Sequence, residues 1–210
     1  MIPRRSTTTY RGMFRDILEA VFSGKLASGD NVPRFENEFG RYIGVEYALA
    51  TSSGRDGLMM ILRNYGLSEG DEIIVPSYTL EDIVKLMREA GYVPVFADVG
   101  KDYNMTLSGI RKAASGRTKA ILATHLFGFP CEIESIVKFA RKRGIVVIED
   151  CAHSLGAECN GRKVGSFGDA AFFSFETRKI INALGGGMIV TNDRKLFMKC
   201  WEELRSAKPS

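Results

Sequence analysis

Residues 119–150 read KAILATHLFGFPCEIESIVKFARKRGIVVIED. The runs 119–124 and 145–149 are short and apolar, as in strands buried on both faces, and a helical repeat of apolar residues lies between them. That repeat consists of Ile133, Ile136, Val137 and Ala140. The order strand, helix, strand predicts two parallel strands joined by a helix that covers one face of a sheet.

The same alternation continues in both directions from this unit. The apolar runs suited to buried strands are 47–51, 72–76, 92–97, 119–124, 145–149, 170–175 and 187–191. Helical patterns separate the first five of them. We therefore predict an α/β fold in three layers (αβα), in which helices sandwich a mostly parallel seven-stranded sheet. Ligands of such sheets bind outside the carboxyl ends of the strands, so the residues that follow each strand are the candidates for chemistry.

Composition excludes several classes of protein. Of the 210 residues, 45% are hydrophobic and 26% charged, which is ordinary for a soluble globular domain. The net charge of +4 comes from scattered basic clusters, so we expect no nucleic-acid partner, and no apolar run is long enough for membrane insertion. The four cysteines lack metal-ligand spacing and no signal-peptide core is present, so we expect no metal, reduced thiols and a cytoplasmic location.

The loop after the first predicted strand suggests an anion site. Ser52, Ser53 and Gly54 stand at a helix start, where hydroxyls and free backbone N–H groups favour a negative charge. The same residues also suit a plain serine N-cap. The loop is neither a Walker A motif nor a G-x-G-x-x-G fingerprint, which argues against a Rossmann-type dehydrogenase.

Two later loops carry ionisable groups. Asp150 ends a buried strand, where a carboxylate requires a cation or donors unless it caps the next turn, and His153 follows three residues later. Lys179 follows the strand 170–175 and is followed directly by Ile180 and Ile181. Apolar surroundings depress the pKa of a lysine and make its amine a nucleophile, although a single lysine is more often an ordinary surface residue.

Together these groups match the needs of pyridoxal phosphate. Lys179 can hold the cofactor aldehyde as a Schiff base, and Asp150 can keep the ring nitrogen protonated. The turn at 52–54 can bind the phosphate at a helix N-terminus, with Ser174 as a further donor. The conjunction is much more specific than any of its parts.

The chain resembles the DegT/DnrJ/StrS family of pyridoxal-phosphate-dependent sugar aminotransferases, whose large domain has the fold type I architecture. The resemblance extends from about Ser23 to Arg205. It rests on the blocks SGKLASGDNVPRFENEFGRYIGVEYALATSSGRDGL, GDEIIVPSYTL, GYVPVFADV, TKAILATHLFG, IVVIEDCAHSLGA, GRKVGSFGDAAFFSF and GGGMIVTND.

The resemblance implies a role for each candidate residue. Lys179, Asp150 and His153 form the implied catalytic set: Lys179 bonds the cofactor, Asp150 pairs with the pyridine nitrogen, and His153 lies near the ring. A lysine at position 179 also argues against the dehydratase branch of the family, in which it is replaced. The implied cofactor-binding set adds Ser52, Ser53, Gly54, Arg55, Leu80 and Ser174.

Three positions depart from the family pattern. Leu80 stands where an aromatic ring usually stacks on the cofactor, and Tyr78 could replace that ring only if the loop shifted. Arg55 replaces a threonine or serine of the phosphate loop and offers a guanidinium fork instead. Gly185 replaces an acidic residue.

The implied activity is the transfer of an amino group, with glutamate as the expected donor, to a nucleotide-linked keto-sugar for polysaccharide or antibiotic sugar biosynthesis. The expected assembly is a homodimer. We expect an N-terminal arm and helix (1–24), a cofactor-binding large domain (25–205) and a tail (206–210), and we expect the small C-terminal domain of the family to be absent. That expected absence leaves an alternative open, namely a truncated, non-catalytic cofactor-binding or regulatory remnant of the family.

Overall fold

The computed structural model describes Gly12, Arg15 and residues 30–206. The arm and helix expected over 1–24 therefore lie outside the described residues, except for Gly12 and Arg15. Of the expected tail, only Ser206 is described.

The seven predicted strands all form, each within one residue of its expected bounds. They are β1 (Tyr47–Thr51), β2 (Glu72–Pro76), β3 (Val93–Ala97), β4 (Thr118–Thr124), β5 (Val146–Asp150), β8 (Ala170–Ser174) and β9 (Gly187–Thr191). They make one sheet in the order β1-β9-β8-β5-β4-β2-β3, in which β9 runs antiparallel to both neighbours and the other pairs are parallel. The sheet is thus mostly parallel, as predicted.

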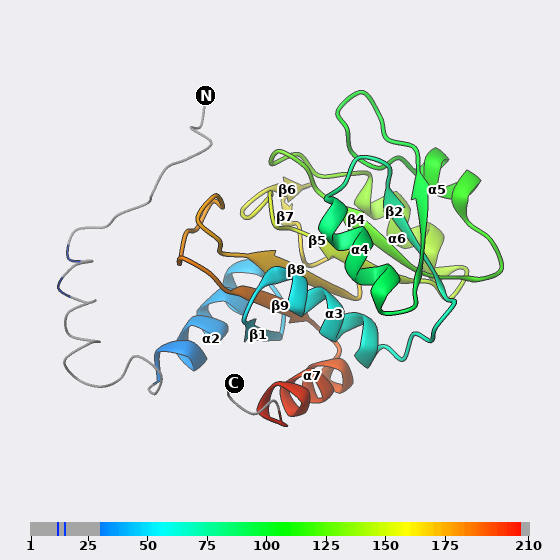
Figure 1. The fold of residues 1–210 in the computed structure, drawn as a ribbon. Helices are drawn as coiled ribbons and strands as arrows, with labels where there is room; N and C mark the ends of the chain where they lie inside the picture. Colours follow the sequence, from blue (N-terminus) through cyan, green and yellow to red (C-terminus); the bar gives the residue numbers. More distant parts are fainter. Residues whose placement is uncertain (1–11, 13–14, 16–29, 207–210) are drawn as a thin grey trace.

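Helices cover both faces of this sheet. They are α2 (Asn31–Ile43), α3 (Gly54–Asn64), α4 (Glu81–Glu89), α5 (Leu107–Ala113), α6 (Ile133–Arg141) and α7 (Arg194–Ser206). Buried residues of α3, α4 and α7 pack on one face, and those of α2, α5 and α6 pack on the other (Figure 1). The predicted three-layer αβα fold is confirmed.

Successive side chains along each strand point to opposite faces of the sheet, so each strand contributes to the hydrophobic core on both faces. In β2, Ile73 and Val75 face α3 and α4, whereas Ile74 between them faces α5 and α6, and all three are fully buried. Burial of each such side chain contributes about 1.5–3 kcal/mol, and strands that are apolar on both faces therefore specify a sheet between two helix layers.

Two elements were not predicted. One is a short hairpin of β6 (Glu158–Cys159) and β7 (Arg162–Lys163). The other is α7, in which Leu196 and Cys200 are buried and Phe197 and Trp201 pack against the same core. Among the helices of the described residues, none is both long and apolar enough to cross a lipid bilayer.

Candidate active site

The neighbouring strands β5 and β8 bring the predicted catalytic residues together. Asp150 is the last residue of β5 and pairs with Phe172 of β8, and the loop after β8 returns Lys179 to the same edge of the sheet. The Nζ atom of Lys179 lies 3.0 Å from Nε2 of His153, in the loop after β5. The three predicted catalytic residues thus form one group.

Asp150 is a buried carboxylate with few partners. Only 4% of the residue is exposed, and one of its oxygens accepts the backbone N–H of Ala152 at 3.0 Å. Burial raises the pKa of Asp150, and the Ala152 N–H and the charge of Lys179 oppose that rise only in part. Its neighbours balance the negative charge of this carboxylate only in part, and a cation placed beside it would balance the rest.

Lys179 carries an amine that is easier to deprotonate than an ordinary lysine amine. Burial is the largest cause of its lowered pKa, and the nearby charges of Arg178 and Arg55 act in the same direction. The carboxylates of Asp150 and Glu176 oppose this effect. The result favours the neutral, nucleophilic amine predicted from the apolar neighbours of Lys179.

The start of α3 lies next to the end of β8. Ser53 is the N-cap of α3, and its side chain accepts the N–H of Asp56 at 3.1 Å. The hydroxyls of Ser52 and Ser53 both donate to the Asp56 carboxylate. Sequence reasoning missed Asp56, although an acid three residues after a serine N-cap has the spacing of a capping box.

Two glycines permit this close approach. A Cβ on Gly54 would lie 3.1 Å from the carbonyl oxygen of Phe173 and 3.2 Å from Cβ of Ser174. A Cβ on Gly187, at the start of β9, would lie 2.6 Å from the backbone N of Gly54. The backbone itself therefore holds Ser174 beside the turn at 52–54 that was predicted to bind an anion.

Replacement of Gly187 by alanine is expected to push β9 away from the start of α3, because the new methyl group would meet backbone atoms that cannot rotate aside. We expect a loss of about 1–3 kcal/mol in the free energy of unfolding, measured by urea denaturation. Gly185→Ala is the matched control, since a Cβ at Gly185 meets nothing within 4 Å. Equal stability of the two variants would contradict this packing.

Arg55 links the first turns of α3 and α4 to the loop that follows β8. Its guanidinium lies 2.9 Å from Asp82, in the first turn of α4, and 3.5 Å from Glu176, three residues before Lys179. All three side chains are about half exposed, so each ion pair contributes little to stability. The structure thus places the predicted phosphate ligand Arg55 in contact with acids that sequence reasoning did not identify.

Leu80 occupies the N-cap position of α4, where it supplies no side-chain hydrogen bond and is 56% exposed. The ring of Tyr78 lies against Tyr103 and Phe127. Tyr78 is therefore engaged by other aromatic rings and does not take over the position of Leu80 in this conformation.

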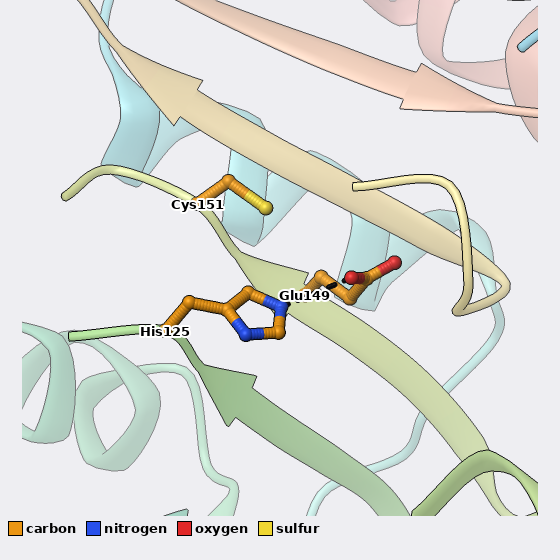
Figure 2. A group of neighbouring side chains, drawn as sticks. All are labelled: His125, Glu149 and Cys151. Atoms are coloured by element: carbon orange, nitrogen blue, oxygen red, sulfur yellow. Dashed lines mark hydrogen bonds and ion pairs between the residues drawn. The ribbon is translucent and has the colours of Figure 1, made fainter. Parts of the chain in front are cut away.

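A buried polar group beneath the site was also missed. His125, Glu149 and Cys151 come from the ends of β4 and β5, and Figure 2 shows the imidazole of His125 bonded to the carboxylate of Glu149. The Nε2–Oε2 distance is 3.0 Å, and Nδ1 of His125 accepts the N–H of Cys131. Burial raises the pKa of the Cys151 thiol to about 12, so the thiol is protonated at neutral pH.

Glu149 organises the loop that precedes β8. Besides His125, its two oxygens accept the backbone N–H groups of Gly165, Phe167 and Gly168 at 2.7–2.8 Å. Four donors saturate the carboxylate, and a metal ion would have to displace them. The geometry therefore indicates a structural tie between β4, β5 and this loop, and does not favour a metal site.

The fold and the site define a class of protein: the large-domain fold of the fold type I aminotransferases, with a lysine, an aspartate and a helix N-terminus at one sheet edge. The chain belongs to the DegT/DnrJ/EryC1/StrS aminotransferase family, whose model matches residues 11–207.

Individual relatives support the assignment. GDP-perosamine synthase of Escherichia coli O157:H7 is 41% identical over 175 residues, which make up 83% of this chain and 48% of that protein. The dTDP-3-amino-3,6-dideoxy-alpha-D-galactopyranose transaminase of Aneurinibacillus thermoaerophilus is 43% identical over 203 residues, with coverages of 93% and 56%. The chain thus spans about half the length of the curated relatives it matches.

A solved structure extends the comparison to a ligand-bound relative. A GDP-4-keto-6-deoxymannose-3-dehydratase with a trapped PLP-glutamate geminal diamine matches this fold with a TM-score of 0.87 and 28% sequence identity. The match covers 95% of this chain and 53% of that one.

Proposed function

We propose that this chain forms the cofactor-holding part of a pyridoxal-phosphate-dependent aminotransferase that moves an amino group from glutamate to a nucleotide-linked keto-sugar. The observation that carries the proposal is the Lys179 amine, 3.0 Å from His153 and in electrostatic contact with buried Asp150. Within this proposal, residues 25–205 are the cofactor-binding unit, and the protein acts as a cytoplasmic homodimer.

The residues present fit this cofactor. Asp150 is a buried carboxylate that lacks a full complement of donors, and a protonated ring nitrogen would provide the missing cation. The glycines at 54 and 187 let β8 and β9 pack directly against the start of α3, a helix N-terminus of the kind that binds a phosphate. Lys179 supplies an amine with a lowered pKa.

Each residue then has a distinct task. The bound cofactor supplies a ring that withdraws electrons from the reacting carbon of the substrate. Asp150 would hold the ring nitrogen in its protonated form, and the Lys179 amine would take a proton from one carbon and return it to another. His153 contacts the Lys179 nitrogen directly and would keep the amine oriented during this transfer. Ser174 would donate a hydrogen bond to the phosphate, and Ser52 and Ser53 would do so once their hydroxyls turn away from the Asp56 carboxylate.

The names of the relatives support the substrate class. The two curated relatives act on GDP- and dTDP-linked sugars by their names, and the related dehydratase was solved with glutamate bound to PLP. We therefore propose glutamate as the donor and a nucleotide-linked sugar as the acceptor.

A half-reaction with glutamate tests the proposal. The purified chain with added cofactor is expected to be yellow, and glutamate is expected to bleach the absorbance of the aldehyde form to that of the amine form. If the chain binds the cofactor but no amino donor converts the cofactor to its amine form, the chain is a non-catalytic relative. If the chain binds no cofactor, the proposal is wrong.

The charges around Lys179 predict two opposite pH shifts. Arg55→Ala removes a positive charge that lowers the pKa of Lys179, so the amine is expected to lose its proton at higher pH. Glu176→Gln removes a negative charge that raises this pKa, so deprotonation is expected at lower pH. Competitive acetylation of the cofactor-free protein, read peptide by peptide by mass spectrometry, follows the neutral amine directly. Exposed Lys142 is the internal control, and shifts of the same sign in both variants would contradict the arrangement.

A further inference from the structure

Three aromatic side chains meet at the carboxyl edge of the sheet, each from a different loop. Tyr78 follows β2, Tyr103 lies between β3 and α5, and Phe127 follows β4. The ring centroid of Tyr78 lies 5.1 Å from that of Tyr103 and 6.5 Å from that of Phe127. The three residues are 50%, 53% and 45% exposed, so this aromatic cluster (Tyr78, Tyr103 and Phe127) keeps much of its ring surface open to solvent.

Two members of the aromatic cluster are held in an unfavourable backbone conformation. The φ angles are 65° at Tyr103 and 56° at Phe127, in the left-handed region that suits glycine or asparagine. The N–H of Tyr103 donates a hydrogen bond to the carbonyl of Gly100 at 3.0 Å, and the N–H of Gly100 donates one to the carbonyl of Asn104 at 2.8 Å. This is a three-residue hairpin loop, and Tyr103 takes the position that glycine usually fills.

The turn at Phe127 is a second case of the same kind. The N–H of Phe129 bonds the carbonyl of Leu126 at 2.9 Å, and Phe127 and Gly128 both have positive φ. This is a type I′ turn, whose first central residue is usually asparagine or glycine. Each of these two turns is thus strained at an aromatic residue whose ring stays about half exposed.

A buried asparagine fixes the two turns relative to each other. The Asn104 side-chain oxygen accepts the N–H of Leu126 at 2.8 Å, and only 2% of Asn104 is exposed. Asn104 directly follows Tyr103, and Leu126 directly precedes Phe127, so this bond sets the spacing of the two rings. Backbone strain that the fold holds in place, and that burial of the side chain does not offset, is typical of ligand-binding positions.

We propose that the aromatic cluster binds the nucleobase of the nucleotide-linked sugar by stacking, an inference that rests on the proposed function. The cluster follows β2 and β4, and Asp150 ends the next strand, β5. Adjacent strands lie about 4.8 Å apart, so the end of β2 is about 14 Å from that of β8, the strand that precedes Lys179. An extended nucleotide sugar can place its sugar at the amine site and its base at this distance. Aromatic rings stack on any base, which suits relatives whose names specify GDP- and dTDP-sugars.

The test uses variants that remove a ring and relieve the strain together. Tyr103→Gly and Phe127→Asn are each expected to weaken binding of GDP, UDP and dTDP by about 10-fold in isothermal titration calorimetry. Their thermal midpoints are expected to stay unchanged or to rise, because glycine and asparagine suit a positive φ, so lost binding would not reflect unfolding. Phe129→Ala is the control, since this ring lies in the same turn, is 64% exposed and is outside the cluster.

The alternative occupant of the aromatic cluster is a second copy of this chain. Nucleotide affinity that is equal in wild type and both variants, or absent from the wild type, would overturn the inference. A drop in the sedimentation-derived mass of the variants with unchanged nucleotide affinity would assign the cluster to a subunit contact. The glutamate half-reaction needs no nucleotide, so the two tests are independent. If glutamate bleaches the absorbance but the chain binds no nucleotide, only this inference is refuted. If the chain fails both tests, the proposed function is refuted as well.

Discussion

Replacement of Lys179 by alanine is expected to reduce the rate of amine exchange with glutamate by about 10²–10⁴-fold, the contribution typical of a positioned acid–base group. Lys179 combines partial burial, a lowered pKa and contact with His153, and within the described residues it is the amine placed beside Asp150. The yellow colour of the protein is also expected to disappear, because Lys179 is the amine proposed to hold the aldehyde.

The measurement is stopped-flow absorbance after glutamate is mixed with the cofactor-loaded protein. Lys142→Ala removes an exposed amine at the end of α6 and serves as the control, with exchange expected at the wild-type rate. A Lys179→Ala protein that stays yellow and exchanges amine within about 10-fold of the wild-type rate would refute the assigned role.

Replacement of Glu149 by alanine is expected to cost about 3–5 kcal/mol in the free energy of unfolding. The change would leave without an acceptor the buried N–H groups of Gly165 and Phe167, the partly buried N–H of Gly168 and the Nε2–H of His125. For a chain of this length the thermal midpoint is expected to fall by roughly 6–20 °C. The loss would be structural in origin, since Glu149 ties loops together beneath the site.

Urea denaturation compares this variant with Glu202→Gln, which alters an exposed acid on α7 and is expected to change stability by less than about 0.5 kcal/mol. If Glu149→Ala were also within about 0.5 kcal/mol of the wild type, the four hydrogen bonds of Glu149 would not hold the loop as described.

The strands and their layers were predictable because the signal is local. Runs such as 72–76 are apolar on both faces, and only a strand between two helix layers buries them fully. Helix α7 was missed although Leu196, Phe197, Cys200 and Trp201 recur at helical spacing. The antiparallel direction of β9 was not specified either, since an apolar run carries no information about strand polarity.

The predicted catalytic residues converge because each follows a strand end at one edge of the sheet. Asp82 and Glu176 were missed because their roles depend on a partner brought close by the fold, Arg55, which is 121 positions from Glu176 in sequence. Asp56 was missed although its partners Ser52 and Ser53 lie only four and three positions away. Glu149 was recognisable only as part of a strand, and its four donors come from loops that a linear pattern does not connect.

The central claim is that Lys179 is the amine that holds the cofactor, and one measurement tests it directly. The chain is incubated with pyridoxal phosphate and reduced with borohydride, which fixes the cofactor to the amine that bears it, and the peptides are then mapped by mass spectrometry. The expected result is a single modified residue at Lys179, at one cofactor per chain. Modification spread over exposed lysines, or none at Lys179, would contradict the account.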